Sequence, residues 1–244
     1  MIIYRNNNGD NMLDLICGFN KLTMVDFDGK MSATIFLGAC NFRCPFCHNS
    51  SLVLDPNDND KVSFEEIYDY LKKRRGILEA VCITGGEPTL YPDLKEMIKK
   101  IKELGYLVKL DTNGTNPSII KELYKEGLID YIAMDIKNSY KKYPITAGKK
   151  SIDNEAIKES IEFLLHSGVD YEFRTTIVNE LHAIDDMKEI AQMIKGAKRY
   201  FLQMFVDNGS CIAGGLHKVE IEDAKAMVQI LKKDIEYVAL RGYE

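Results

Sequence analysis

The sequence predicts an α/β fold, a partial (β/α)6 TIM-like barrel whose strands are mainly parallel and whose sheet stays open. Three observations lead to this prediction. From about residue 31 onward, short apolar segments alternate with longer segments of helical spacing, which is the pattern of βαβ units. The apolar segments are continuous rather than alternating, as expected for strands that are buried on both faces. Six such units can be read from the sequence, fewer than the eight of a closed barrel.

The predicted elements follow one another along the chain. A short hairpin is expected over residues 14–30, with Asp28-Gly29 as its turn. Strands are expected at 31–38, 80–84, 107–110, 131–136, 171–178 and 200–206, with a short one at 237–240. Helices are expected at 63–73, 92–104, 117–126, 152–167, 184–195 and 219–232. Ser63 and Glu66 predict a capping box at the start of the first helix.

We expect the chain to form one domain over residues 1–244, because no Pro/Gly/Ser-rich linker and no abrupt change of composition divides it. Its parts are an N-terminal extension with the hairpin (1–30), the core barrel (31–206), and a C-terminal helix with a short strand (207–244). A monomer is expected.

Composition narrows the classes of function. The net charge of −5 argues against broad binding to nucleic acid, and the basic run 72–75 reads as the solvated end of a helix. No apolar run approaches the about 20 residues of a membrane span. Residues 1–10 are polar and lack the order of a signal peptide. We therefore expect a cytoplasmic protein that binds neither nucleic acid nor membrane.

Chemically distinctive residues follow the predicted strands. Active-site groups of parallel α/β folds lie at the carboxyl ends of strands and in the loops after them. In chain order these residues are Cys40, Cys44 and Cys47, then Gly85, Gly86 and Glu87, then Asp111, Thr112, Asn113 and Gly114, then Asp135 and Lys137, then Arg174 and finally Gln203. The sequence thus predicts one active site at this edge of the sheet.

Three of the six cysteines form the motif CxxxCxxC within Cys40–Cys47. In a reducing cytosol such a group binds metal more often than it forms disulfides. Thiolates suit an iron–sulfur cluster, and three of them on a cubane leave one iron open to substrate. Zinc, with His48 as a fourth ligand, is the alternative. Cys17, Cys82 and Cys211 are dispersed and are read as free thiols or small apolar fillers.

The cysteine motif resembles the CxxxCxΦC loop of the radical S-adenosylmethionine (SAM) superfamily, with Phe46 at the aromatic position. The resemblance implies one [4Fe–4S] cluster on Cys40, Cys44 and Cys47. SAM would chelate the fourth iron through its methionine group and be cleaved to methionine and a 5′-deoxyadenosyl radical that abstracts hydrogen. No catalytic acid or base is implied. Gly85-Gly86-Glu87-Pro88 resembles the GGE motif of that superfamily, in which the carboxylate binds the SAM amino group, and its glycines allow close approach of the backbone to a ligand.

Two further motifs resemble those of glycyl radical enzyme activating enzymes. These are Asp111-Thr112-Asn113-Gly114 and the DxK sequence of Asp135 and Lys137. The resemblance implies that both line the SAM site, with Lys137 contacting SAM and with Asp111, Thr112 and Asp135 as candidate ligands of a monovalent cation, Na⁺ or K⁺. Arg174 corresponds to an arginine near the SAM carboxylate. Where other members carry a histidine near the adenosine, this chain has Gln203 and Phe205.

The resemblance covers most of residues 16–206 and is strongest to the activating proteins of anaerobic ribonucleoside-triphosphate reductase. It rests on Gly18–Asp28 and on the loop from Cys40 to Asn49. It implies that the partner is a glycyl radical enzyme and that flavodoxin or ferredoxin donates the electron. Auxiliary clusters are not expected, because the other cysteines are dispersed.

Two other functions remain open from the sequence. The first is a small-molecule radical SAM enzyme such as a 7-carboxy-7-deazaguanine synthase-like enzyme, whose size and GGEP motif are similar. The second is a cluster-binding redox sensor or electron carrier without catalysis, for which GGE and DTNG would have no purpose.

Overall fold

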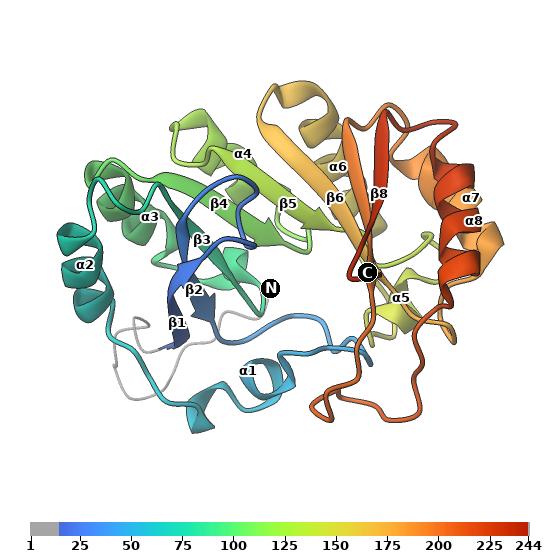
Figure 1. Ribbon diagram of the computed structural model, residues 1–244, viewed down its shortest axis with the longest axis horizontal. Helices are drawn as coiled ribbons and strands as arrows, with labels where there is room; N and C mark the ends of the chain where they lie inside the picture. Colours follow the sequence, from blue (N-terminus) through green and yellow to red (C-terminus); the bar gives the residue numbers. More distant parts are fainter. Residues whose placement is uncertain (1–14, 244) are drawn as a thin grey trace. The chain divides into compact units, whose positions relative to one another are not determined.

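The computed structural model describes residues 15–243, so residues 1–14 of the expected N-terminal extension and residue 244 lie outside the described part (Figure 1). Contacts within the chain divide it into two compact units. Of the described residues, unit 1 comprises 15–41, 51–112 and 121–131, and unit 2 comprises 42–50, 113–120 and 132–243.

Unit 1 is built on four strands in chain order. They are β1 (Ile16–Thr23), β2 (Ser32–Leu37), β3 (Ala80–Gly85) and β4 (Leu107–Thr112). β1 pairs antiparallel with β2, and β2, β3 and β4 are parallel. Between β1 and β2, Lys30 N–H donates to Phe27 O at 3.0 Å across the Asp28-Gly29 turn. The hairpin is therefore not confined to residues 14–30 as predicted, because its second arm is β2, the first strand of the parallel set.

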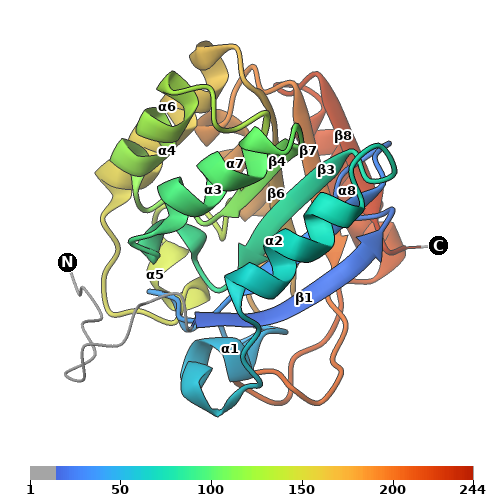
Figure 2. The same ribbon diagram turned by 90° about the vertical axis from the view of Figure 1, so that its left-hand side faces the viewer.

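Two amphipathic helices of unit 1, α2 (Phe64–Lys73) and α3 (Leu94–Glu103), cover its sheet. The unit also contains α1 (Ser50–Leu54), which starts on the last residue of a unit 2 segment, and the short 3-10 helices η2 (Pro56–Asp58) and η3 (Pro88–Leu90). α2 and α3 lie side by side on one face of the sheet (Figure 2). α2 buries Phe64, Ile67 and Leu71, a helical spacing of apolar residues. The predicted capping box is present, with Ser63 and Glu66 each bonding the other's backbone N–H.

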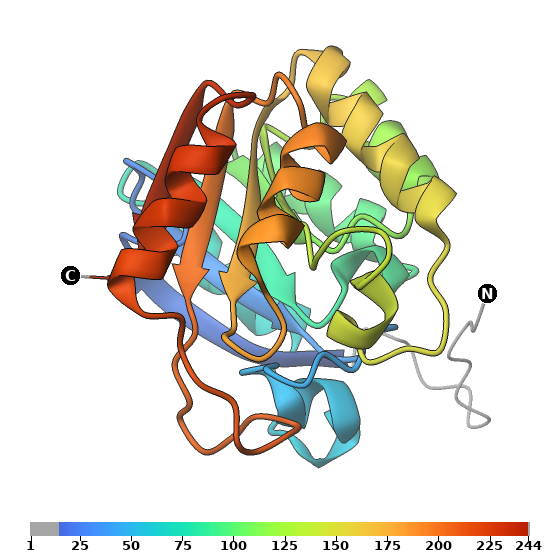
Figure 3. The same cartoon turned by 90° about the vertical axis from the view of Figure 1, so that its right-hand side faces the viewer.

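Unit 2 carries the later strands and helices. α4 (Pro117–Lys125) and β5 (Tyr131–Asp135) contain residues of both units. The remaining elements are α5 (Tyr143–Thr146), α6 (Asn154–Ser167), β6 (Asp170–Ile177), α7 (Ile184–Met193), β7 (Arg199–Met204), α8 (Ile221–Leu231) and β8 (Tyr237–Arg241). β6, β7 and β8 are parallel neighbours, and α7 and α8 pack side by side over them (Figure 3).

The predicted α/β class is confirmed, with six strands, β2 to β7, each followed by a helix. Within residues 15–243, the sheet of neither unit closes on itself. The element ends differ from the predicted ones by a few residues. β4 continues through Thr112, so Asp111 and Thr112 are strand residues rather than loop residues. None of the helices in this part of the chain combines the length and apolar character that a membrane crossing requires.

Candidate functional site

The residues singled out by the sequence fall into two sets. Unit 1 contains Cys40, Gly85, Gly86, Glu87, Asp111 and Thr112. Unit 2 contains Cys44, Phe46, Cys47, Asn113, Asp135, Lys137, Arg174 and Gln203.

In unit 1, Gly85 at the end of β3 and Gly86 directly after it lie against the backbone that leads into the cysteine loop. A Cβ atom on Gly86 would stand 1.8 Å from Ala39 O, and one on Gly85 would stand 2.3 Å from Leu37 O. Gly86 N–H donates to Leu37 O at 2.8 Å, and Glu87 N–H donates to Ala39 O at 2.9 Å. The missing side chains therefore let two backbone segments join just before Cys40.

Ala39 has an unusual backbone conformation. Its φ of 64° makes it the one non-glycine residue with positive φ in residues 15–243. An L-residue in this region costs about 1–2 kcal/mol. The bond from Glu87 N–H helps hold the strained residue, and strain of this kind is often found at functional sites. The backbone next to Cys40 is thus held in a strained conformation by its surroundings.

Glu87 is a buried carboxylate, 1% exposed, that joins two motifs of unit 1. Its Oε1 accepts hydrogen bonds from Thr89 N–H at 3.1 Å, from Thr89 Oγ1 at 2.5 Å and from Thr112 Oγ1 at 2.8 Å. The last bond links the GGE loop to β4. Because all three bonds reach the same oxygen, they fix the plane of the carboxylate and hence the direction of Oε2.

Asp111 is paired with a lysine that the sequence analysis did not single out. Lys109 Nζ lies 3.3 Å from Asp111 Oδ1, and the two side chains are 7% and 13% exposed. Cys82 is fully buried, and its Sγ lies 3.8 Å from the same oxygen as a weak donor. The available signal was a charged residue inside an apolar strand, Leu107–Leu110.

In unit 2, the cysteine loop is held by short backbone contacts. Cys47 N–H donates to Cys44 O at 3.0 Å, and Arg43 N–H donates to Ala147 O at 2.9 Å. A Cβ atom on Gly148 would stand 1.9 Å from Arg43 O, so that close approach needs a glycine. These contacts place Cys44 and Cys47 in one tight turn.

A second segment runs beside this turn in unit 2. Ala213 N–H donates to Pro45 O at 2.9 Å, and Ser210 Oγ donates to His48 O at 3.3 Å. Cys211 lies between these two contacts and therefore near Cys47. No disulfide forms among the cysteines of residues 15–243.

Burial shifts the pKa of two thiols of the loop, Cys44 and Cys47, and of the neighbouring Cys211. Burial raises the pKa of Cys44 to about 11, and the charge of Lys137 opposes that rise only in part. Burial likewise raises the pKa of Cys47. Burial, with the charges of Asp207 and Cys47, raises the pKa of Cys211. A cationic iron centre would supply the charge that stabilises thiolates here.

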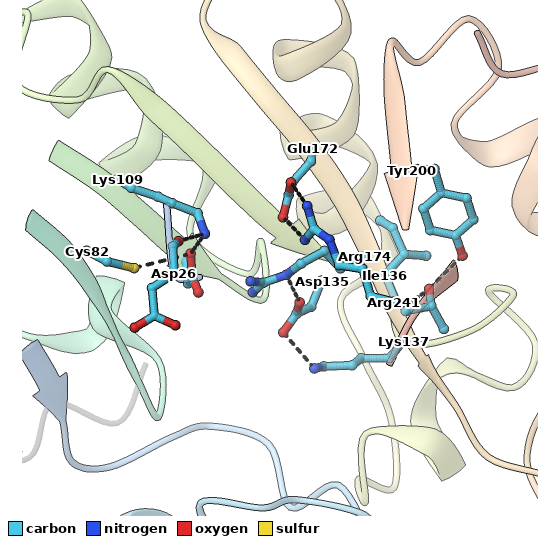
Figure 4. A network of polar contacts seen from close by, with 12 residues as sticks. Asp26, Cys82, Lys109, Asp135, Ile136, Lys137, Glu172, Arg174, Tyr200 and Arg241 are labelled. Carbon is cyan, nitrogen blue, oxygen red and sulfur yellow. Dashed lines mark hydrogen bonds and ion pairs between the residues drawn. The ribbon is translucent and has the colours of Figure 1, made fainter. Parts of the chain in front are cut away.

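Asp135 is held between two cations of unit 2 (Figure 4). Arg174 Nε lies 2.9 Å from Asp135 Oδ1, and Lys137 Nζ lies 3.0 Å from Asp135 Oδ2. Burial on its own would raise the pKa of Asp135, but the charges of Arg174 and Lys137 outweigh it and bring the pKa to about 2. Burial on its own would lower the pKa of Lys137, but the charge of Asp135 raises it. The sequence-predicted trio is therefore one ion-pair network.

His182 contacts residues of this ion-pair network and of the cysteine loop, and the sequence did not predict its role. Its Nδ1 accepts from Val178 N–H at 3.0 Å, which leaves Nε2 to donate to Lys137 O at 2.9 Å. Its ring meets Phe46 edge-on, with centroids 6.4 Å apart. Burial lowers the pKa of His182 and keeps the ring neutral. A lone histidine after a strand carries no sequence signal for this role.

The remaining predicted residues have local roles or lie in β7. Asn113 Oδ1 accepts from Thr115 N–H at 3.1 Å and from Thr115 Oγ1 at 2.7 Å, an Asx turn after β4. Gln203 is a half-buried residue of β7, in register with Thr176 and Arg241. Phe205 is buried and lies 5.7 Å, ring to ring, from His48.

Within each unit, the described residues contain no group of three His, Cys, Asp or Glu side chains placed to hold a single metal ion.

Comparisons with known proteins agree with these motifs. The family model described as the radical SAM superfamily matches residues 34–194. A candidate glycyl-radical enzyme activating enzyme of Methanocaldococcus jannaschii is 38% identical over 202 residues, 80% of this chain and 81% of that protein. A second one from the same organism is 26% identical over 66% of this chain and 62% of its own length. Among solved structures, SuiB of Streptococcus suis bound to S-adenosylmethionine is similar in fold. Its TM-score is 0.66 at 16% identity, over 84% of this chain and 48% of that one.

Proposed function

Because this chain belongs to the radical SAM superfamily, we propose that it is the activating enzyme of a glycyl radical enzyme. The observation that carries the proposal is the 38% identity to the M. jannaschii activating-enzyme relative over 81% of that protein's length. The family match over residues 34–194 takes in segments of both units. We accordingly treat residues 1–244 as a single radical SAM domain.

The family implies a [4Fe–4S] cluster and SAM, and the donor set fits the cluster. Cys40, Cys44 and Cys47 offer three soft sulfur ligands, and Cys44 is sheltered from water at 7% exposure. When bound, the two groups supply one-electron cleavage of SAM, so that methionine and 5′-deoxyadenosine result once a hydrogen atom has left the substrate. The chain itself would position the two groups, place charged side chains around them and exclude water.

The remaining residues act on the methionine part of SAM in this proposal. The fixed carboxylate of Glu87 accepts hydrogen bonds from the amino group. Arg174 would bind the carboxylate of the SAM methionine and Lys137 would contact SAM. Asp135 would set their orientation by holding Nε of Arg174 and Nζ of Lys137. His182 keeps Lys137 and Phe46 in place through its ring. Gln203 or Phe205 would contact the adenosine.

The residues expected to hold Na⁺ or K⁺ do not fit a free ion. Asp111 has Lys109 beside it, and Asp135 has both Lys137 and Arg174. No step is assigned to such an ion.

The substrate in this proposal is a glycine of a partner protein, with anaerobic ribonucleotide reductase as the partner. One hydrogen atom would leave the Cα of that glycine, so that the partner would hold a glycyl radical. Flavodoxin or ferredoxin supplies the electron. An oxygen-sensitive centre held by thiolates, and thiols without disulfides, favour a reducing cytoplasm. The chain is proposed to act as a monomer.

Electron paramagnetic resonance (EPR) tests the proposal on an anaerobic mixture of reconstituted protein, reductant, SAM and anaerobic ribonucleotide reductase. A glycyl-radical doublet that is absent with Cys44→Ala is the expected result. SAM cleavage without a doublet would reject this partner and turn attention to other glycyl radical enzymes or to a small-molecule substrate. Neither doublet nor cleavage, with an intact reduced cluster, would contradict the function itself.

A further inference from the structure

Lys109 occupies a buried row of polar residues that crosses the sheet of unit 1. Thr34 of β2 is in register with Cys82 of β3, and Cys82 with Lys109 of β4. Lys109 is 5% exposed as a whole residue. Lysine is almost never buried to this extent unless it is paired. The groups that contact the Lys109 ammonium therefore indicate the role of this residue.

The contacts of Lys109 make its ammonium the positive centre of this row (Figure 4). Nζ lies 3.3 Å from Asp111 Oδ1 and also donates to Asp26 O. It stands 5.9 Å from the centre of the Tyr131 ring, within reach of a cation–π interaction. Thr34 Oγ1 donates to Asp26 Oδ2 at 2.5 Å and so steadies the residue whose carbonyl Lys109 uses.

The other oxygen ligands expected for a monovalent cation are also engaged by the protein. Asp135 is paired in unit 2 with Lys137 and Arg174. The hydroxyl of Thr112 donates a hydrogen bond to Glu87 in unit 1. Each of the two carboxylates therefore already has a positive charge that is covalently part of the chain.

A free Na⁺ or K⁺ at Asp111 would have to compete with that charge. Two positive charges about 4 Å apart repel each other strongly at the effective dielectric constant of a protein surface. An ion beside Asp111 would meet this repulsion from Lys109, whose side chain is only 7% exposed.

We infer that Lys109 takes the place of a monovalent cation at Asp111, so that this enzyme binds SAM without Na⁺ or K⁺. The inference rests on the proposed function, because it concerns the same SAM site. Lys109 is a positioning residue: it orients Asp111 and touches neither substrate nor reacting atoms.

The test measures SAM binding, not turnover. The anaerobically reconstituted enzyme and its Lys109→Met variant are dialysed against labelled SAM in KCl, NaCl or tetramethylammonium chloride at equal ionic strength. The change that SAM causes in the EPR spectrum of the reduced cluster is a second readout. We expect the wild-type Kd to be the same in all three salts. Lys109→Met should bind SAM weakly in tetramethylammonium chloride and recover by about 5- to 150-fold in KCl or NaCl, the usual range of coupling between two sites.

Lys30→Met is the matched control, since Lys30 pairs with Glu79 at 3.0 Å on the exposed surface of the same unit. It should bind SAM like the wild type in every salt. A wild-type enzyme that needs K⁺ or Na⁺ would overturn the inference, and so would a Lys109→Met variant that is equally indifferent to the salt. Absence of SAM binding by the wild type in all salts would instead contradict the proposed function.

A direct measurement covers the case in which Lys109→Met does not fold. Thallium-205 NMR of the wild-type enzyme with Tl⁺, which mimics K⁺, should show no saturable site. Saturable Tl⁺ binding that disappears in Asp111→Asn would overturn the inference.

Discussion

The hydroxyl of Thr112, at the end of β4, donates to Oε1 of Glu87 in the loop after β3 at 2.8 Å. Two motifs that lie 25 residues apart are thereby one hydrogen-bonded unit. Because the bond is buried, a change in either residue is expected to affect the other.

Removing the charge of Glu87 should weaken SAM binding without loss of iron. Glu87→Gln keeps an oxygen for Thr89 and Thr112 but loses the negative charge offered to an ammonium group. Hydrogen bonds to charged groups contribute about 1.5–3 kcal/mol, so we expect Kd for SAM to rise by about 10- to 100-fold. Dialysis with labelled SAM measures the Kd, and an iron assay measures the iron content. Glu79→Gln, on the surface of unit 1, is the control. Unchanged SAM affinity in Glu87→Gln would refute the assigned role.

Removing the hydroxyl of Thr112 should lower stability. Thr112→Val leaves Glu87 short of one donor in a buried place, at a cost of about 1–3 kcal/mol. Tm of the reconstituted protein should fall by several degrees. Thr112→Ser keeps the hydroxyl and should lose much less. If valine and serine were equivalent, the bond would contribute nothing.

A methyl group on Gly86 should displace the start of the cysteine loop. Its Cβ would lie 1.8 Å from Ala39 O, so the backbone next to Cys40 must move. We expect Gly86→Ala to lose at least about 1–3 kcal/mol and to retain less iron after reconstitution. Gly214→Ala, with nothing within 4 Å of its Cβ, should stay within about 0.5 kcal/mol of wild type. Normal iron content and Tm in Gly86→Ala would contradict the packing described.

Asp135 should make stability depend on acid pH. Its pKa is held at about 2, below the usual 3.8, so the folded state gains stability from its ionised form above pH 3.8 and loses it as pH falls toward 2. Asp135→Asn should remove this part of the pH dependence. It should also cost about 3 kcal/mol at pH 7, the lower end for a broken buried pair, because Asp135 keeps 29% exposure.

Thermal unfolding between pH 2 and 7 checks this prediction. Glu180→Gln is the comparison, since its hydrogen bonds from His217 also lower the pKa of Glu180 to about 2, but on the surface. Only Asp135→Asn should weaken SAM binding as well. An Asp135→Asn variant with the wild-type pH profile would show that the ion-pair network adds no stability.

The cluster should depend on Cys44 and not on Cys211. Cys44→Ala should abolish the brown colour and the iron, because it removes one of three ligands. Cys211→Ala should keep both, although Cys211 lies beside the loop. Visible absorption and iron content after anaerobic reconstitution show whether each variant keeps the cluster. Loss of iron in Cys211→Ala would mean that a fourth thiol belongs to the site.

The strands and main helices were predictable because their signals are local. Apolar runs and helical spacing located β2 to β8 and six helices to within a few residues. The capping box of Ser63 and Glu66 was equally local. The short helices α1 and α5 were missed, since five and four residues are too few to show a helical period.

The sequence identified most residues of the candidate site, but it identified few of the side-chain contacts between them. Motif spacing identified Glu87 and Asp111 but not their partners. Thr112 reaches Glu87 because β3 and β4 are neighbouring strands, which only the fold sets. Lys109 lies two residues before Asp111 on β4, so the two side chains share one face of the sheet and their contact follows from strand periodicity. Gly85 and Gly86 were expected to allow close approach to a ligand, and the structure also gives both a role against Leu37 and Ala39.

The left-handed backbone of Ala39 constrains how this protein can evolve. At φ 64°, glycine is unstrained and asparagine or aspartate is tolerated, whereas β-branched residues are excluded. Natural variation ahead of the first cysteine should therefore be restricted to a few residue types, even though this side chain performs no chemistry. A genome search that weighs position 39 as well as the cysteines would separate true descendants of this lineage from chance matches to CxxxCxxC.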